Sequence, residues 1–337
     1  MTKRLLLLAV VLLLGTTPLA AKTPDQLRAE FIDMMVAQHG FSRDQVTRTL
    51  YQAHTKRKIL EAISRPAERR LNWSEYRDIF VKPDRIAGGV KFWQQHAETL
   101  ARAEREYGVP PHIIVAILGV ETRYGAHTGG YRVLDALHTL GFHYPRRGKF
   151  FRAQLDHFLR FAREEDIDPT MPTGSYAGAM GVPQFMPDSF RIYAIDFDGD
   201  GRRDIWNNTA DVIGSVANYF VEKGKWQRGQ PVTHPARGAD GSHRRLIDAG
   251  ARPTLQPSQL QAAGIDVGDV PAGAKVSLLE FKTHDGREYW IGMHNFYSIM
   301  RYNPRTKYAM AVYQLAEAIR ERYPQVVTAD SAGGAGK

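Results

Sequence analysis

Apolar residues recur every three or four positions over the first third of the chain, as at Leu27, Phe31 and Met34. This spacing is that of a helix with one buried face. We therefore expect residues 22–105 to form a helical N-terminal domain.

The next helix carries one unexpected charge. Pro111 stands where a helix can begin without losing a hydrogen bond, and Gly125 is placed to end it. Between them, Glu121 falls on the same side as Ile113 and Ile117. Burial disfavours the charged form of a carboxyl group, which suits a general acid that works near neutral pH. Glu121 is therefore a catalytic candidate, although a structural ion pair with an arginine would explain the same pattern.

The later pattern alternates between helix and loop. Residues 276–281 and 288–292 flank Asp285-Gly286 and predict a β-hairpin. The other expected segments are helix over 134–165, a Gly/Pro/Ser loop over 169–187, helix over 210–221, irregular chain over 225–270, helix over 309–322, and a disordered tail after Thr328.

Composition limits the class of protein. The 337 residues, 43% hydrophobic and 24% charged, are enough for two or three packed units of an ordinary globular protein. A net charge of +9 favours polyanionic partners. Because the basic residues are scattered and form no stripe with interleaved aromatic residues, nucleic-acid binding is not expected.

The N-terminus resembles an export signal. Lys3 and Arg4 precede the apolar run 5–14, and the small residues Ala20 and Ala21 follow. The run is shorter than the roughly 20 residues that span a bilayer, so we expect a cleaved signal peptide rather than an anchor. Without any Cys the chain has no disulfide and no lipid-bearing cysteine. A soluble periplasmic protein is expected.

Two further segments carry candidate chemistry. Residues 175–187 combine small residues with Ser175 and Gln184, whose side chains can hydrogen-bond a polyhydroxylated ligand, although a well-packed loop would have the same composition. Residues 196–202 resemble the start of an EF-hand loop. The expected ligands at its positions one, three, five and seven are the side chains of Asp196, Asp198 and Asp200 and the backbone carbonyl of Arg202.

Several short motifs stand in a fixed order along the chain. They are Val120-Glu121-Thr122-Arg123-Tyr124-Gly125, Leu134-Asp135-Ala136-Leu137, Tyr144-Pro145-Arg146-Arg147, Gly178-Ala179-Met180-Gly181 with the loop to Pro187, Asp196 to Trp206, Gly214 to Phe220, and Asn295-Phe296-Tyr297 to Asn303. Together they resemble the lytic murein transglycosylase B family of the lysozyme-like superfamily.

The resemblance implies a mainly α (α+β) fold, with a lysozyme-like catalytic core flanked by a helical domain and a small β-containing domain. The expected divisions are a signal peptide (1–21), the helical domain (22–105), the core (106–225) with an EF-hand-like loop (196–211), the β-containing domain (226–292), a C-terminal segment returning to the core and the helical domain (293–325), and a disordered tail (326–337).

The resemblance also implies the activity. Such enzymes cut the β-1,4 bond between N-acetylmuramic acid and N-acetylglucosamine in peptidoglycan and leave a 1,6-anhydromuramic end. Glu121 falls on the family's single acid/base. Its glycan-binding residues fall on Ser175, Gln184, Tyr219, Tyr302, Asn303 and Tyr308. Tyr124 stands at a position of this motif where the family commonly has Trp. We expect this difference to alter the stacking of sugars without preventing catalysis.

No second carboxylate stands out in these motifs, although most glycosidases use two. We therefore expect Glu121 to protonate the glycosidic oxygen, with assistance from the substrate's own N-acetyl group, which Ser175 would orient. Glu121 would then take the proton from the muramic 6-hydroxyl as that oxygen attacks the anomeric carbon. Gln184 and Asn303 would bind sugar groups.

The acidic loop departs from an EF-hand at position twelve, where Asn207 replaces Glu. The resemblance implies a later closing carboxylate, which falls on Asp211. We expect a structural Ca²⁺ here and no organic cofactor; an empty Asp/Gly turn is the alternative.

Two other functions stay open from sequence. One is a muramidase that uses water, and the other is a non-catalytic, calcium-stabilised protein that binds glycans. The expected partners are peptidoglycan glycan strands and other cell-wall enzymes, and a monomer is expected.

Overall fold

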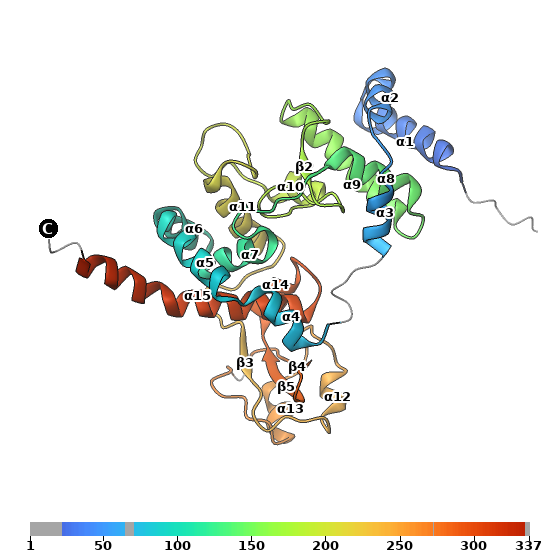
Figure 1. The fold of residues 1–337 in the computed structure, drawn as a ribbon. Coiled ribbons are helices and arrows are strands. Elements are labelled where there is room, and N and C mark those ends of the chain that lie inside the picture. Colours follow the sequence, from blue (N-terminus) through green and yellow to red (C-terminus); the bar gives the residue numbers. More distant parts are fainter. Residues whose placement is uncertain (1–21, 65–70, 272, 334–337) are drawn as a thin grey trace, which may run out of the picture.

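The computed structural model describes residues 22–64, 71–271 and 273–333, and for 325–333 the backbone alone (Figure 1). The expected signal peptide, residues 1–21, lies outside the described residues. In the part of the chain that is described, no helix is both long enough and apolar enough to cross a membrane.

The fold is mainly helical, as expected. The helices are α1 (Pro24–His39), α2 (Arg43–Tyr51), α3 (Arg57–Ser64), α4 (Trp73–Phe80), α5 (Pro83–Gln95), α6 (Ala97–Tyr107), α7 (Pro111–Thr122), α8 (Val133–His143), α9 (Gly148–Glu164), α10 (Pro187–Tyr193), α11 (Thr209–Glu222), α12 (Arg244–Ile247), α13 (Pro257–Ala262), α14 (His294–Met300) and α15 (Thr306–Gly333). The strands are β1 (Tyr131–Arg132), β2 (Thr173–Gly174), β3 (Thr233–Pro235), β4 (Ser277–Lys282) and β5 (Arg287–Gly292).

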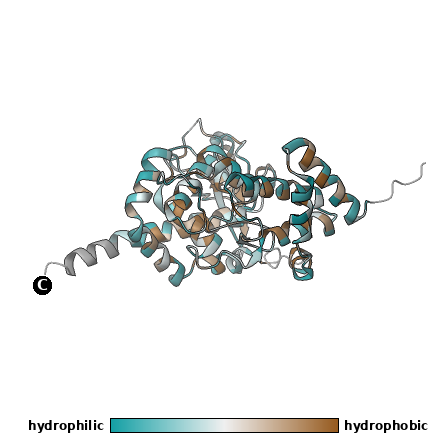
Figure 2. Cartoon of the chain, turned by 90° about the horizontal axis from the view of Figure 1, so that it is seen from above, coloured by the Kyte–Doolittle hydropathy of each residue, from teal (hydrophilic) through white to brown (hydrophobic). Residues whose placement is uncertain are grey.

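Helix α7 is at the centre of the main hydrophobic core. It packs against α15 and α5, with further contacts to α6 and α11. Of its residues only His112 and Glu121 are not fully buried. The helix is therefore apolar on every side rather than along one stripe. Over the molecule as a whole, helices carry both hydrophobic and hydrophilic residues (Figure 2). A carboxylate at the end of such a helix lies beside the core.

The helices of residues 22–105 do not pack as a single group. Helix α3 contacts α8, and α1 contacts α8 and α9, whereas α4 and α5 pack against α15 (Figure 1). The apolar faces that the sequence reveals are thus covered by segments from later in the chain. The domain boundaries given by the sequence remain predictions.

The predicted hairpin is present. Strands β4 and β5 pair antiparallel up to Lys282 opposite Arg287, and the Thr283 N–H donates to the Gly286 carbonyl across the turn. The sheet order is β3-β5-β4. Strand β3 lies in a segment expected to be irregular, because three residues are too few for alternation to be recognised. A second hydrophobic cluster lies between residues 236 and 293 and gives this β-containing part a core of its own.

The final helix is longer than expected. Helix α15 extends to Gly333, past residue 326, where the tail was expected to begin; the expected disorder of the tail remains a prediction. Extending an existing helix costs far less than nucleating one, and Ala, Gln and Val can continue it. Residues 334–337 lie outside the described chain.

Candidate active site and acidic loop

Glu121 lies in the last turn of α7, where the chain turns sharply. The helix ends at Thr122, three residues before the expected Gly125, because Arg123 and Tyr124 both adopt left-handed backbone conformations (φ 51° and 61°). The Arg123 and Tyr124 N–H groups donate to carbonyls of the last turn. A half-buried carboxylate is thereby held at the edge of the core.

Tyr308 contacts this carboxylate directly. Its hydroxyl donates a hydrogen bond to Oε1 of Glu121 at 2.5 Å. Tyr308 is buried near the start of α15, and this burial, followed by the negative charge of Glu121, raises its pKa well above the usual value of a tyrosine. The hydroxyl therefore stays protonated and remains a donor to Glu121 at neutral pH.

Two other tyrosines lie near enough to the same carboxylate for its charge to act on them. Burial raises the pKa of both Tyr219 and Tyr302, and in each case the charge of Glu121 adds to the effect. Their rings lie 4.7 Å apart between centroids. Their hydroxyls are anchored, that of Tyr302 to the Pro183 carbonyl at 2.6 Å and that of Tyr219 to the Arg301 carbonyl at 2.7 Å. Of the expected site residues, Tyr308 thus contacts Glu121, while Tyr219 and Tyr302 contact each other nearby.

The loop that carries Ser175 and Gln184 is held by its own hydrogen bonds. The Ser175 hydroxyl accepts from the N–H groups of Ala177 and Ala179. Gln184 has a left-handed backbone (φ 53°), and its amide nitrogen donates to the carbonyls of Thr128 and Gly181. Among the described residues, the amide oxygen of Gln184 and the hydroxyl proton of Ser175 have no hydrogen-bond partner, so both are available to a sugar. Asn303 is half-buried in the turn between α14 and α15.

One residue that the sequence analysis did not select joins this loop to the catalytic helix. Thr122 is buried, and its hydroxyl donates to the Val182 carbonyl at 2.9 Å and accepts from the Gly125 N–H at 3.0 Å. The only sequence signal is its position beside Glu121, since a threonine at a helix end does not reveal a partner sixty residues away.

Tyr124 does not have its expected role. Its ring packs between α5 and α7, close to Gly88, Gly89 and Gly119, and its hydroxyl donates to the Arg85 carbonyl at 2.7 Å. The left-handed backbone at Arg123 and Tyr124 directs this side chain into the helix packing. The expectation that it alters sugar stacking is therefore wrong.

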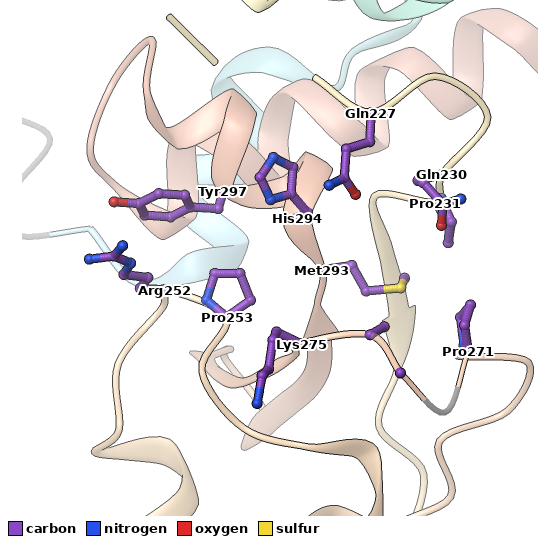
Figure 3. A pocket seen from close by; sticks show the side chains of 12 residues that line it. Gln227, Gln230, Pro231, Arg252, Pro253, Pro271, Lys275, Met293, His294 and Tyr297 are labelled. Atoms are coloured by element: carbon purple, nitrogen blue, oxygen red, sulfur yellow. The ribbon is translucent and has the colours of Figure 1, made fainter. Parts of the chain in front are cut away.

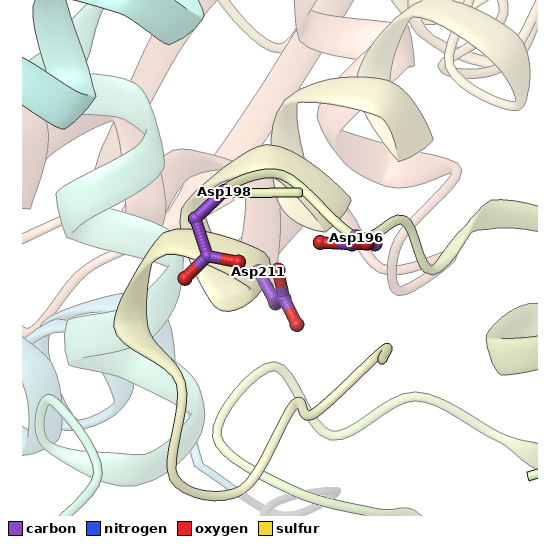
Figure 4. A group of neighbouring side chains, drawn as sticks. All are labelled: Asp196, Asp198 and Asp211. Carbon is purple, nitrogen blue, oxygen red and sulfur yellow. The ribbon is translucent and has the colours of Figure 1, made fainter. Parts of the chain in front are cut away.

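The acidic loop gathers three of its expected carboxylates. Oxygen atoms of Asp196, Asp198 and Asp211 all lie within 4.8 Å of one another (Figure 4). Asp211 is fully buried and accepts hydrogen bonds from the N–H groups of Phe197 and Asp204. Burial raises the pKa of Asp211; the two hydrogen bonds lower it, and the charges of Asp198 and Asp196 raise it further.

One of the expected ligands is placed differently. The Asp200 carboxylate accepts from the Arg202 N–H at 2.9 Å and is not part of the three-carboxylate group. The backbone carbonyl of Arg202 stays a predicted ligand. Asn207, at position twelve, donates to Asp204 instead. The fit to a cation rests on Asp211, because a buried carboxylate beside two others is stabilised by a positive charge.

Comparisons with known proteins match most of the chain. A family model described as "Transglycosylase SLT domain" matches residues 23–317. The chain is similar to the membrane-bound lytic murein transglycosylase B of Escherichia coli, with 45% identity over 302 residues, covering 86% of this chain and 81% of that protein.

Solved structures of lytic transglycosylases are also similar to this chain. Soluble lytic transglycosylase SltB1 of Pseudomonas aeruginosa is 52% identical, with a TM-score of 0.83, covering 88% of this chain and 99% of that one. Escherichia coli Slt35 in complex with calcium is 43% identical, with a TM-score of 0.79 and coverages of 88% and 93%. SltB3 of Pseudomonas aeruginosa, solved with NAG-NAM-pentapeptide, is 31% identical, with a TM-score of 0.78 and coverages of 89% and 80%.

Proposed function

The chain belongs to the transglycosylase SLT domain family and is a peptidoglycan lytic transglycosylase, and we propose that Glu121 is its single acid/base catalyst. The observation that carries this proposal is the half-buried Glu121 carboxylate, which accepts a hydrogen bond from buried Tyr308. This bond fixes the orientation of the carboxylate, which favours proton transfer at a chosen atom.

In the first step, protonated Glu121 gives its proton to the glycosidic oxygen between N-acetylmuramic acid and N-acetylglucosamine. The bond from the anomeric carbon to that oxygen breaks, and the substrate's N-acetyl oxygen supplies electrons to the anomeric carbon. Ser175 orients the N-acetyl group. Tyr308 then donates to a carboxylate that has gained negative charge, so its hydrogen bond strengthens as the proton leaves.

In the second step, Glu121 removes the proton from the muramic 6-hydroxyl. That oxygen attacks the anomeric carbon, displaces the N-acetyl oxygen and closes the 1,6-anhydro ring. Glu121 ends protonated, as it began, so no proton is gained or lost over the cycle. The amide oxygen of Gln184 and the side chain of Asn303 bind sugar groups.

Product analysis tests this mechanism. Mass spectrometry of peptidoglycan digested by the enzyme is expected to find 1,6-anhydromuramic ends. Reducing ends one water heavier, as the main product, would make the protein a muramidase. No cleavage by any form of the protein would leave only a glycan-binding role.

We also propose that the loop 196–211 binds one structural calcium ion. Slt35, a relative, was solved with calcium, and the grouped carboxylates of Asp196, Asp198 and Asp211 supply oxygen ligands of the right kind. The ion would balance their charges and hold the loop closed. If calorimetry on the chelated protein showed no calcium uptake, this part of the proposal would be abandoned.

The compartment and partners follow from the same function. We place the protein in the periplasm, exported by residues 1–21, as a monomer that acts on peptidoglycan glycan strands. Its association with other cell-wall enzymes stays a prediction.

A further inference from the structure

A pocket whose lining does not include Glu121 lies where α14 meets the β-containing part (Figure 3). Its volume is about 540 Å³. Residues from four separate segments line it, among them Gln227 and Gln230 after α11, Arg252 and Lys275 from two different loops of the β-containing part, and His294 and Tyr297 on α14.

A buried side chain holds this pocket in shape. Asn295 is fully buried; its side-chain oxygen accepts from the Gln227 N–H, and its nitrogen donates to the carbonyls of Gln227 and Gln230. Asn295 thereby ties segment 227–230 to α14. The motif Asn295-Phe296-Tyr297, which the catalytic mechanism leaves without a role, thus builds one side of the pocket.

The polar groups of the pocket favour an anion. No Asp or Glu lines it, and within the described residues Arg252, Lys275 and the Tyr297 hydroxyl have no hydrogen-bond or ion-pair partner. Arg252, Lys275 and Met293 all line the pocket (Figure 3); the first two are exposed, whereas Met293 is buried. A ligand with carboxylates and short aliphatic parts would satisfy both regions.

We propose that this pocket binds the carboxylate-bearing peptide stem of peptidoglycan, an inference that rests on the proposed function. Met293 and His294, at the beginning of α14, line the pocket, and Tyr302 follows the other end of this helix. Seven helical residues rise about 10 Å, and four extended peptide residues reach about 13 Å. A stem attached to a sugar in the groove is therefore long enough to span the length of α14.

The first experiment measures binding without turnover. The probe is a synthetic stem tetrapeptide (L-Ala, γ-linked D-Glu, L-Lys, D-Ala) with free carboxylates, and its carboxamide analogue is the comparison. By calorimetry or NMR titration, the full-length protein is expected to bind the acid form about tenfold more tightly, as expected for two partly exposed ion pairs. Equal affinity for the two peptides, or no binding of either, would overturn the proposal.

Paired variants test the site itself. Arg252→Glu with Lys275→Glu is expected to remove this preference, and Arg252→Lys with Lys275→Arg to keep it. Arg48→Glu with Lys58→Glu makes the same change in net charge on exposed residues of α2 and α3 and is expected to have no effect. If the Arg48/Lys58 double variant lost the preference for the acid peptide as fully as the Arg252/Lys275 double variant, that preference would reflect net charge. The pocket would then be excluded as the binding site.

Kinetics then connect the pocket with cleavage. The pocket pair is expected to raise KM about tenfold for glycan chains that carry stems, while kcat and the KM for chains stripped of stems stay unchanged. An equal rise in KM for both substrates would overturn the proposal. If the wild-type protein cleaved neither substrate, the proposed function would fail, whereas the peptide titration would still decide on the pocket.

Discussion

The hydroxyl of Tyr308 donates a hydrogen bond to Oε1 of Glu121, although the two residues stand 187 positions apart in the chain. This bond joins the end of the central helix α7 to the beginning of α15. The active site is therefore a junction between two helices that already pack together in the core. Its geometry depends on that packing as much as on the residues that face the substrate.

Replacement of Tyr308 by Phe removes this bond and keeps the ring. We expect kcat to fall about tenfold or more, since a hydrogen bond to a charged group contributes about 1.5–3 kcal/mol. The thermal midpoint should change little. Tyr313→Phe, on the same helix, is the matched control and should retain full activity. Steady-state kinetics on soluble glycan chains measure both variants. An unchanged kcat for Tyr308→Phe would show that the Tyr308 hydroxyl has no role in catalysis.

The hydroxyl of Thr122 should prove necessary for the position of the loop that carries Gln184. Thr122→Val keeps the shape but leaves the Val182 carbonyl and the Gly125 N–H without this partner, at a cost of about 1–3 kcal/mol for each buried group. We expect both stability and kcat to fall. Thr122→Ser keeps the hydroxyl and should restore most of kcat. Equal kcat values for the Val and Ser variants would contradict a positioning role.

The packing of Tyr124 gives a stability prediction. A Cβ atom at Gly119 would lie 2.6 Å from the Tyr124 hydroxyl oxygen, which is fixed on Arg85. Gly119→Ala should therefore lower the free energy of unfolding by about 1–3 kcal/mol, as overpacking usually does. At Gly130 a Cβ would meet nothing within 4 Å, so Gly130→Ala is the control. Denaturant unfolding compares them, and a fully stable Gly119→Ala protein would place the Tyr124 ring elsewhere.

Calcium and pH should act together on the acidic loop. The pKa of Asp211 is raised in the folded protein, so the folded state holds this proton more tightly than the unfolded state. In chelated protein, stability should fall as the pH rises from the usual Asp range through this raised pKa. Calcium replaces the proton as the balancing charge, so it should raise the thermal midpoint more at about pH 7 than at about pH 4.

The variant Asp211→Asn separates this effect from general acid denaturation. In this variant, calcium should raise the thermal midpoint much less, and the fall in stability with rising pH that depends on Asp211 should also disappear. A calcium effect of the same size at both pH values, measured by scanning calorimetry, would show that Asp211 is not the group responsible.

Local sequence patterns predicted those parts of the fold that depend on local spacing. The α11 helix and the β4–β5 hairpin follow from apolar periodicity and an Asp-Gly turn, and both are present. Strand β3 and the left-handed end of α7 were not predicted. A three-residue strand is defined by its partner β5, and the residues at the end of α7, Arg123 and Tyr124, are ones that seldom adopt left-handed conformations.

In the candidate site, too, local sequence patterns predicted some residues, whereas others depend on distant segments of the chain. The apolar neighbours of Glu121 marked it from the sequence alone, whereas Tyr219, Tyr302 and Tyr308 came only through family resemblance, because tyrosines carry no local sign of a shared partner. The contacts made by Thr122 and Tyr124 were beyond prediction. Both depend on chain segments far away in sequence, Val182 and Arg85.

The most direct test of the account is the activity of Glu121→Gln, which keeps the size of the side chain and removes its ability to exchange a proton. Glu317→Gln, a half-buried glutamate of α15, serves as the control. The measurement is the rate of release of 1,6-anhydromuropeptides from purified peptidoglycan. We expect Glu121→Gln to bind peptidoglycan normally and to release these products at least about 100-fold more slowly, while Glu317→Gln works normally. Release by Glu121→Gln at the wild-type rate would contradict the account.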